Sequence, residues 1–294
     1  MRSQFKLLLL PVFLSLIVAM LNCEVVADTK LSETHEKIYS ASGYQTIEIK
    51  NEAGNIQVET NAIDSIYIEY DKICYSTNDD EALQGIKDIE VSIDCDSTEG
   101  VISISTFVEV ISDINEYQVD FYLSIPENIL CDLSNDIGEI KLNGLANPPI
   151  LSTGSGDITL EHMKCGIKKL NSRWGNIDCS IDTLCDSSKV VISTVYGSQT
   201  IHILSIDTTV NADLNLTSQH GSIKTYLLEK SYIDFDLKTS SVGEVSVEGF
   251  DNISHGEKWL KRHKIGTIGN NLKNGKFRLR ASSETGNVKL RPVE

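Results

Sequence analysis

The sequence is poor in basic residues and lacks the short motifs that identify common enzymes. It contains 26 Lys and Arg residues against 42 Asp and Glu residues, so its formal net charge is −16 over 294 residues. A nucleic-acid partner requires a basic footprint, and this composition therefore argues against one. The chain also has no P-loop, no dinucleotide-binding fingerprint, no G-x-S-x-G elbow and no H-E-x-x-H helix. We predict no catalytic residues and no cofactor.

Closely spaced cysteine pairs are also absent, as are long apolar runs beyond the N-terminus. The sequence has no C-x-x-C, so we expect no structural metal site of the zinc type. No later segment approaches the run of about 20 apolar residues that spans a membrane. Three cysteines, Cys165, Cys179 and Cys185, lie close in sequence, and we expect any disulfide there first. Cys95, Cys131 and Cys179 also fit small core hydrophobes, since they continue apolar strand faces.

The N-terminus has the pattern of an export signal. Arg2 and Lys6 precede a short apolar run, and residues 1–27 are predicted to be a cleaved signal peptide. Residues 28–43 would then form a polar, irregular lead-in segment. The alternative is a bacterial lipoprotein box that ends at Cys23, where a lipid would be attached. We therefore expect an exported protein of the periplasm, the cell surface or the extracellular space, which contacts a membrane only if Cys23 is lipidated.

A short phrase recurs along the chain: a small polar turn, one glycine, a polar residue, then alternating apolar and polar positions. The clearest copy runs from Ser152 to Leu160. Glycine accepts the positive φ of a sharp corner, and the residues after it suit a half-buried strand. From residue 138 to residue 243 the glycines are 18, 19, 22, 24 and 22 positions apart. The predicted corner glycines are Gly54, Gly138, Gly156, Gly175, Gly197, Gly221, Gly243 and Gly286.

A repeat near 20 residues with one or two strands per period predicts a solenoid, because each turn can bury its apolar face only against its neighbours. We expect a single-domain, all-β protein over residues 44–292, built as a parallel β-solenoid (β-helix). A right-handed coil is expected, although no residue fixes its hand. Residues 44–128 are expected to be an irregular β portion with a short helix over 78–88, and residues 129–292 the regular turns. Within them, residues 250–275 are expected to be a long loop.

The phrase Gly-(Asp/Asn/Glu/Ser)-(Ile/Val)-x-(Leu/Val), repeated to the C-terminus, resembles the putative-adhesin β-solenoid family of bacterial envelope domains. The strand from Val119 to Pro126 and the terminal phrase from Thr285 to Leu290 are similar to the family's usual lead-in and end. The resemblance covers roughly residues 44–292, and the irregular first half departs from it. It implies a surface or adhesion module of unknown function and gives no catalytic residue to carry over.

The residue before the glycine is an aromatic ring in three successive turns, namely Trp174, Tyr196 and His220. Turns that stack about 4.8 Å apart would bring these rings into a ladder along one edge. Such stacking stabilises a fold by about 0.5–1.5 kcal/mol per pair, and flat rings also suit sugars. We favour the structural role and keep contact with a glycan as the alternative.

Two further groups of polar residues are candidates for binding. The residues after the glycines, such as Asn55, Asp157 and Asn176, are expected to form a solvated row, with weak calcium binding as the alternative. The second group is the one basic island of this acidic chain. Its default interpretation is a solvated loop, and its alternative is contact with an anionic partner through Lys258, Lys261, Arg262 and Lys264.

Together these features predict a non-enzymatic envelope or surface module, adhesin-like, that presents a rigid face for binding or assembly. A carbohydrate-binding module that uses the aromatic edge is the alternative, and a polysaccharide-degrading β-helix enzyme comes third. Asp234 and Asp236 share one face of a predicted strand, where we expect solvent rather than a glycosidase pair. The expected partner is an unidentified envelope component, either a glycan or a protein. Self-association through open solenoid ends is a further expectation.

Overall fold

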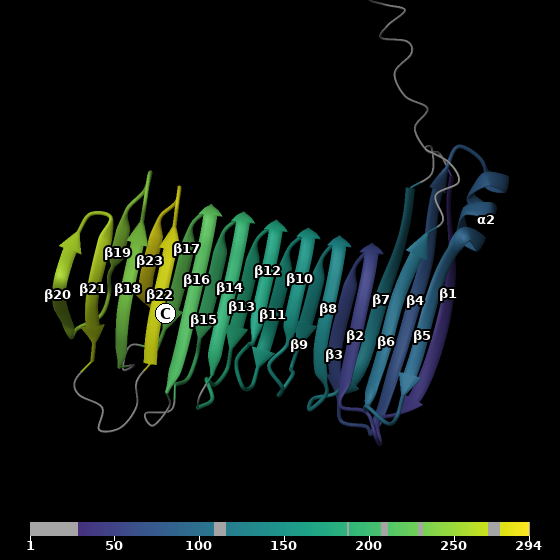
Figure 1. The fold of residues 1–294 in the computed structure, drawn as a ribbon, viewed down its shortest axis with the longest axis horizontal. Coiled ribbons are helices and arrows are strands. Elements are labelled where there is room, and N and C mark those ends of the chain that lie inside the picture. Colours follow the sequence, from purple (N-terminus) through teal and green to yellow (C-terminus); the bar gives the residue numbers. More distant parts are fainter. Residues whose placement is uncertain are drawn as a thin grey trace, which may run out of the picture.

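The chain forms two large β-sheets that lie face to face around one apolar core (Figure 1). The structure is a computed structural model and describes residues 29–108, 116–186, 188–206, 211–228, 232–269 and 277–293. Regular structure in these described residues is almost entirely strand, which confirms the expected all-β class. The predicted signal peptide and Cys23 lie outside them. No helix in the described part of the chain is long and apolar enough to cross a membrane.

The two sheets have 11 and 12 strands and are called sheet A and sheet B. The spatial order of sheet A is β1 (Thr29–Ser40), β4 (Ser65–Ser76), β7 (Glu116–Pro126), β3 (Ile56–Asn61), β9 (Ile140–Asn143), β11 (Ile158–Met163), β13 (Ile177–Ile181), β15 (Gln199–Ile203), β17 (Ile223–Leu227), β23 (Val288–Pro292) and β19 (Val245–Val247). The spatial order of sheet B is β20 (Ile253–Leu260), β21 (His263–Ile268), β18 (Ile233–Thr239), β22 (Phe277–Ser283), β16 (Ala212–His220), β14 (Lys189–Tyr196), β12 (Lys169–Trp174), β10 (Ile150–Ser155), β8 (Leu130–Ile137), β2 (Thr46–Ala53), β6 (Val101–Val108) and β5 (Ile89–Asp96).

The central part of the chain, from β8 to β17, alternates between the two sheets. Strands β8, β10, β12, β14 and β16 pair in parallel in sheet B, and β9, β11, β13, β15 and β17 do the same in sheet A. Alternate residues of each strand face the core, as in Val190 and Ile192 of β14, which are 1% and 0% exposed. Burying a side chain of this size contributes about 1.5–3 kcal/mol, so the alternating pattern fixes which face turns inward.

The sheets are mixed rather than purely parallel, which corrects the expectation of a uniformly parallel coil. At the N-terminal end, β4 pairs antiparallel with β1 and β7, and β5 pairs antiparallel with β6. At the C-terminal end, β21 pairs antiparallel with β18 and β20. Antiparallel strands can be joined by short turns, so both ends are built from local pairings that the central repeat does not use.

The last two strands of the chain do not lie at the end of the stack. Strand β22 lies between β16 and β18 in sheet B, and β23 lies between β17 and β19 in sheet A. All four of these pairings are parallel. The sequence predicted a closing pair after the 250–275 stretch but not its position. Figure 1 shows this pair (yellow) set between earlier, green strands.

Two segments that were expected to be irregular are strands. Residues 29–40 form β1, which pairs along its whole length with β4. It is an edge strand with mostly exposed side chains, so its sequence lacks the apolar alternation of a core strand. Most of the expected loop over 250–275 is the hairpin of β20 and β21, while residues 270–275 lie outside the described part of the chain.

The short helix expected over 78–88 is confirmed as α2 (Asp79–Asp88). Asn78 caps it, since its Oδ1 accepts a hydrogen bond of 2.9 Å from the backbone N–H of Glu81. The buried side chains of Ala82 and Ile86 pack against Cys74 of β4. This small satellite cluster lies at the N-terminal end of the two sheets.

A disulfide joins Cys165 to Cys185, within the group of cysteines where a bridge was expected. The two Cα atoms are 5.1 Å apart and belong to the connections that follow β11 and β13. The bridge therefore ties two successive turns together at the edge opposite the glycine corners. Cys131 and Cys179 are fully buried, and burial raises the pKa of both thiols, that of Cys131 to about 12. These two thiols belong to the core.

Candidate functional site

The central turns pass from sheet B to sheet A at the predicted glycines. At Gly175 the φ angle is 153°, and a Cβ added there would lie 2.0 Å from the carbonyl oxygen of Gly156 in the preceding turn. Similar contacts of 2.1 and 2.3 Å link Gly286 to Gly221 and Gly243 to Gly286. The glycines thus form one column in the spatial order of the strands. Only a residue without a Cβ lets successive corners approach this closely.

A buried polar side chain near each corner supports it from the inside. Ser172 Oγ donates a hydrogen bond of 3.1 Å to the carbonyl oxygen of Gly156, and Ser283 Oγ donates one of 2.8 Å to that of Gly221. These contacts satisfy carbonyl groups that would otherwise be buried without a partner. Sequence reasoning missed this role, although the signal is visible as a polar residue three positions before the glycine: Asn51, Asn135, Thr153, Ser172, Thr194, Ser218 and Ser283.

The polar row after the glycines connects successive turns. Asp157 Oδ1 accepts a hydrogen bond of 2.6 Å from the backbone N–H of Asn176, and Asn176 Oδ1 accepts one of 2.9 Å from that of Ser198. Asn287 Oδ1 likewise accepts from Glu244 N–H at 2.9 Å. These side-chain oxygens are occupied by backbone donors. Among the described residues, no group of three or more His, Cys, Asp or Glu side chains is placed to hold a metal ion.

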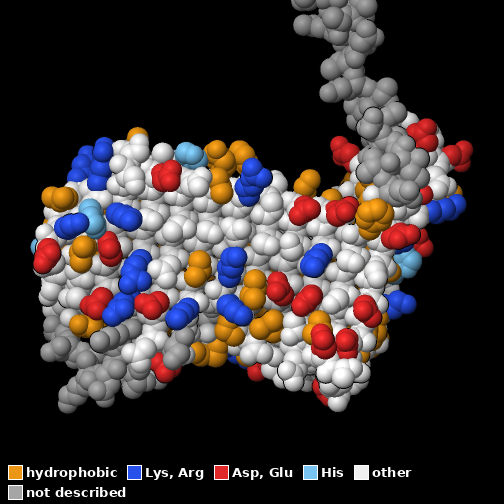
Figure 2. All heavy atoms as spheres, in the orientation of Figure 1, with side chains coloured by type: hydrophobic (Ala, Val, Ile, Leu, Met, Phe, Trp, Pro, Cys, Tyr) orange, Lys and Arg blue, Asp and Glu red, His pale blue; other side chains and the backbone are white. Residues whose placement is uncertain are grey.

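The three rings predicted to form a ladder lie together at the ends of β12, β14 and β16. The ring centroids of Trp174 and Tyr196 are 3.9 Å apart with planes at 10°, and those of Tyr196 and His220 are 4.8 Å apart with planes at 19°. Trp174 is 50% exposed and Tyr196 40% exposed. Figure 2 shows hydrophobic side chains beside a histidine at this upper edge of sheet B. The predicted stacking is therefore present, whereas contact with a ligand remains a prediction.

Stacking leaves one broad face of this ladder free of other rings. Tyr196 lies between its two neighbours, so both of its faces are covered. His220 bonds through Nδ1 to Thr285 Oγ1 at 3.0 Å. On the other side of Trp174 the paired residue is Ser155, which has a small side chain. The indole face above Ser155 is the surface on which a flat ligand ring can lie.

The basic island lies on the hairpin of β20 and β21, and two of its four cations are engaged within the chain. Lys261 Nζ lies 2.6 Å from Glu244 Oε1, and this contact lowers the pKa of the Glu244 carboxyl group. Lys264 Nζ lies 4.8 Å from the ring centroid of Trp259. Lys258 and Arg262 are exposed and form no ion pair with a described residue. Anion binding by this island remains a prediction.

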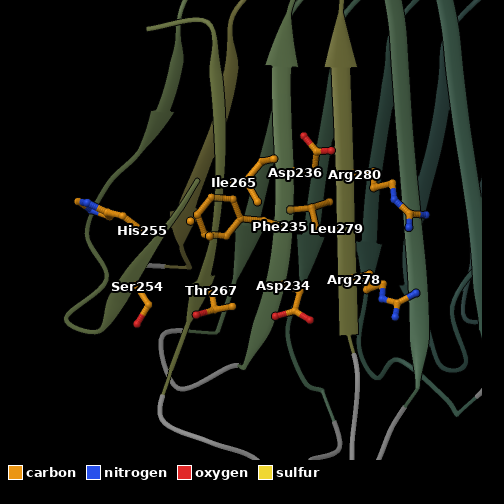
Figure 3. A pocket seen from close by; sticks show the side chains of 12 residues that line it. Asp234, Phe235, Asp236, Ser254, His255, Ile265, Thr267, Arg278, Leu279 and Arg280 are labelled. Carbon is orange, nitrogen blue, oxygen red and sulfur yellow. The ribbon is translucent and has the colours of Figure 1, made fainter. Parts of the chain in front are cut away.

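A hollow of about 400 Å³ lies on the outer face of sheet B across β20, β21, β18 and β22 (Figure 3). Its lining includes Asp234, Asp236, Arg278 and Arg280. Asp236 Oδ1 is 2.8 Å from Nε2 of His263, whereas the other three side chains have no hydrogen bond or ion pair within the described residues. Figure 3 shows the two arginines extending side by side, away from both carboxylates. Sequence reasoning missed these arginines, because their position depends on the insertion of β22 beside β18.

Two more hollows continue from this one across the sheet toward the aromatic ladder. The next has a volume of about 180 Å³ and shares Asp236 and Arg280 with the first. The third has a volume of about 420 Å³ and shares Lys238 with the second. It reaches Val195 and Gln219, which directly precede two of the ladder residues. The charged hollow and the ladder thus lie at the two ends of one uneven surface.

Comparison with known proteins establishes no family for this chain, since no family model and no curated protein matches it. A "putative cell adhesion protein" from Clostridium sporogenes aligns at 11% identity and a TM-score of 0.39, over 90% of this chain and 100% of that one. A "putative adhesin" from Bacteroides fragilis aligns at 8% identity and a TM-score of 0.35, over 89% and 97%. A "putative lipid binding protein" from Parabacteroides distasonis aligns at 11% identity and a TM-score of 0.28, over 90% and 97%. At these TM-scores the likeness establishes neither a common function nor a common family.

Proposed function

We propose that this chain is a non-enzymatic, exported surface module that binds carbohydrate through the outer face of sheet B. The observation that carries the proposal is the exposed ladder of Trp174, Tyr196 and His220. These rings are held in a fixed stack at an open edge, where Trp174 is 50% and Tyr196 40% exposed. A flat, pre-ordered aromatic surface loses little conformational entropy when a sugar ring packs against it.

The floor beside the ladder has the chemistry that a sugar requires. One row of outward-facing residues crosses β8, β10, β12, β14, β16 and β22, and all of its side chains are small and polar. They are Ser134, Ser152, Asn171, Ser193, Thr217 and Ser282. Hydroxyl and amide groups can both donate to and accept from sugar hydroxyls. Figure 2 shows this part of the face as a broad band with few charged or hydrophobic side chains.

We also propose that the central region is a β-solenoid with turns of about 20 residues, closed at both ends by antiparallel strands. The parallel pairing from β8 to β17 and the single column of corner glycines support this description. Such a scaffold holds its outer face rigid, which suits adhesion. The proposal includes display at the cell surface, in the periplasm or outside the cell, with Cys23 as the candidate lipid anchor. Protein partners and self-association stay as predictions.

A glycan-array screen of residues 28–294 tests the proposed function. We expect specific hits that are lost in Trp174→Ala, because this substitution removes the free ring face. The matched control is Tyr226→Ala on sheet A, which breaks the stacked pair of His202 and Tyr226 (4.5 Å, 7°). Hits that survive in the control but weaken at least about tenfold in Trp174→Ala support the proposal. A blank array, or equal binding by both variants, contradicts it.

A further inference from the structure

We infer that the charged hollow over β18 and β22 seats a uronic-acid residue, so that the carbohydrate bound by this face is an acidic one. The inference rests on the proposed carbohydrate-binding function and specifies the sugar class. It is carried by the side chains that line the hollow and by their position relative to the aromatic ladder.

The two arginines supply the carboxylate-binding part of the hollow. Arg278 and Arg280 occupy alternate positions of β22, so both point outward and lie about 7 Å apart along the strand. Neither forms an ion pair within the described residues, although each is paired in register with an aspartate of β18. A guanidinium group presents a planar fork that matches a carboxylate with two parallel hydrogen bonds. Two unpaired forks on one strand are therefore available to an incoming acid.

The two aspartates supply the part that recognises hydroxyl groups. The side chain of Asp234 makes no hydrogen bond within the described residues, and Asp236 uses Oδ1 for His263. Ionised carboxylates only accept hydrogen bonds, so they suit the hydroxyl donors of a sugar ring. Ser254 and Thr267 also line the hollow, and each can donate or accept.

This mixture of charges disfavours other simple ligands. A phosphate ion bound by the arginines would be repelled by the negative charges of the two aspartates in the same hollow. A neutral sugar would satisfy the aspartates but leave both guanidinium groups without an anionic partner. An amino sugar would be repelled by the arginines. A uronic acid carries one carboxylate, which suits the arginines, beside several hydroxyls, which suit the aspartates.

The local charge of this end of the molecule also favours an acid. The described ranges 232–269 and 277–293 contain nine Lys and Arg residues against seven Asp and Glu, whereas the whole chain has a net charge of −16. Figure 2 shows basic and acidic side chains interleaved on this part of the face. An acidic polymer would therefore be repelled by most of the molecule and accepted at this end.

The linked hollows give the ligand a direction. From the charged hollow, the surface continues past Lys238 to the residues beneath the ladder. Lys238 is exposed and has no ion pair within the described residues. A polymer with its uronic acid at Arg278 and Arg280 could therefore lie along this path and reach Trp174.

Isothermal titration calorimetry with sodium D-glucuronate, D-glucose, D-glucosamine and inorganic phosphate, at equal ionic strength, tests the inference. We expect glucuronate to bind at least about tenfold more tightly than each of the other three, by the argument from paired charges. A uronic-acid tetramer should bind more tightly than the monomer if the natural source is a polymer, and equally if it is a free sugar acid. Phosphate or glucosamine binding as tightly as glucuronate, or no binding of glucuronate, would overturn the inference.

Variants of exposed residues identify the hollow without altering the core. The double variant Arg278→Gln/Arg280→Gln should weaken glucuronate binding at least about tenfold, and Arg278→Lys/Arg280→Lys should restore only part of it because the forks are lost. The matched control is Lys169→Gln, in the same row of sheet B three strands from Arg280. Equal weakening by this control would reduce the effect to general charge and contradict a defined site. Unchanged thermal melting confirms that each variant folds.

The failure of this inference can be told apart from failure of the proposed function. If neutral glycans bind through Trp174 while glucuronate does not bind, the proposed function stands and the acidic class is wrong. If glucuronate needs the two arginines but no glycan needs Trp174, the hollow stands and the ladder is structural. If long acidic oligomers lose binding in Trp174→Ala and also in the double arginine variant, both the proposed function and the acidic sugar class are supported.

Discussion

The centre and the two ends of this molecule are stabilised in different ways. In the centre, similar contacts recur at successive corners: a glycine, a buried polar side chain three positions before it and, at several corners, a side-chain oxygen that accepts from the next turn. At the ends, each contact occurs once, as in the capped helix α2 and the hairpin of β20 and β21. Both kinds of region have alternating apolar faces, so the hydrophobic core alone does not distinguish them.

The repeated contacts belong to turns inside the stack, and the contacts that occur once belong to its exposed ends. A turn in the centre has neighbours on both sides, whereas an end strand has an open edge that must be protected from pairing with other chains. The edge strand β1 is largely exposed and carries charges of both signs, and β20 is likewise mostly exposed. The centre should therefore unfold as one unit, and the ends should open locally.

The largest effect should come from a corner glycine. In Gly175→Ala the new Cβ would meet the Gly156 carbonyl oxygen at 2.0 Å, in a backbone conformation with φ of 153°. We expect a loss of about 4 kcal/mol in the free energy of unfolding, measured by urea denaturation. The control is Gly43→Ala, where φ is 96° but no atom lies within 4 Å, and about 1 kcal/mol should be lost. Equal losses would mean that the close corner contact is unimportant.

A smaller and more local effect is expected at the C-terminal end. Trp259 is half-buried against the core, edge-on to Phe235 at 6.1 Å and stacked on His255 at 3.7 Å. Trp259→Ala should cost about 2 kcal/mol and should speed hydrogen exchange in β20 and β21. Exchange in β12 and β14 should stay unchanged. Faster exchange in those central strands would contradict local opening.

The buried hydroxyl at a corner should contribute less than the glycine. Ser172→Ala removes the hydrogen bond to the Gly156 carbonyl oxygen and leaves that oxygen without its side-chain donor. We expect a loss of about 1 kcal/mol, measured by urea denaturation. Ser193→Ala on the outer face is the control, because water can replace the Ser193 hydroxyl as the hydrogen-bond donor to Asn171 Oδ1. A loss at Ser193 as large as at Ser172 would remove the distinction between inner and outer polar rows.

The smallest effect is a local pH dependence of helix α2. Hydrogen bonds from Asn78, and then from Thr77 and Ser76, lower the pKa of the Glu81 carboxyl group in α2. A carboxylate whose pKa is lowered by folding stabilises the folded state above its ordinary pKa of 4.5, and this stabilisation disappears as the pH falls through the lowered value. The protection factors of the α2 amides, which correct for the pH dependence of intrinsic exchange, should therefore fall on acidification below pH 4.5. In Glu81→Gln this fall should be absent, and an unchanged acid response would assign it to another group.

The sequence predicted the corners and the ladder because both follow from short-range spacing. Gly156, Gly175 and Gly197 mark successive turns in the sequence. Trp174 directly precedes the second of these glycines, and Tyr196 directly precedes the third. Once successive turns pair in register, these rings must meet. The helix could be predicted for the same reason, since Asn78 and Glu81 form a local cap.

The parts that were missed depend on long-range pairing or on an unusual face. Strand β1 has no apolar alternation, because it is an exposed edge. The hairpin of β20 and β21 is rich in polar residues and Gly, which are also typical of a loop. The charged hollow could not be predicted, because Arg278 lies in register with Asp234 only through the position of β22 beside β18 in the sheet.

The inserted position of β22 and β23 has a consequence for how the protein is made. Strands β18 and β19 are synthesised before the pair that must separate them from β16 and β17. The C-terminal end of the stack therefore stays open until residues 277–293 have been synthesised. A chain that stops short of residue 277 lacks a joint rather than an outer strand, because β18 and β19 pair with the strands that precede them only through β22 and β23. Such a chain leaves the edges of β16 and β17 unpaired, and open edges of this kind invite pairing with other chains.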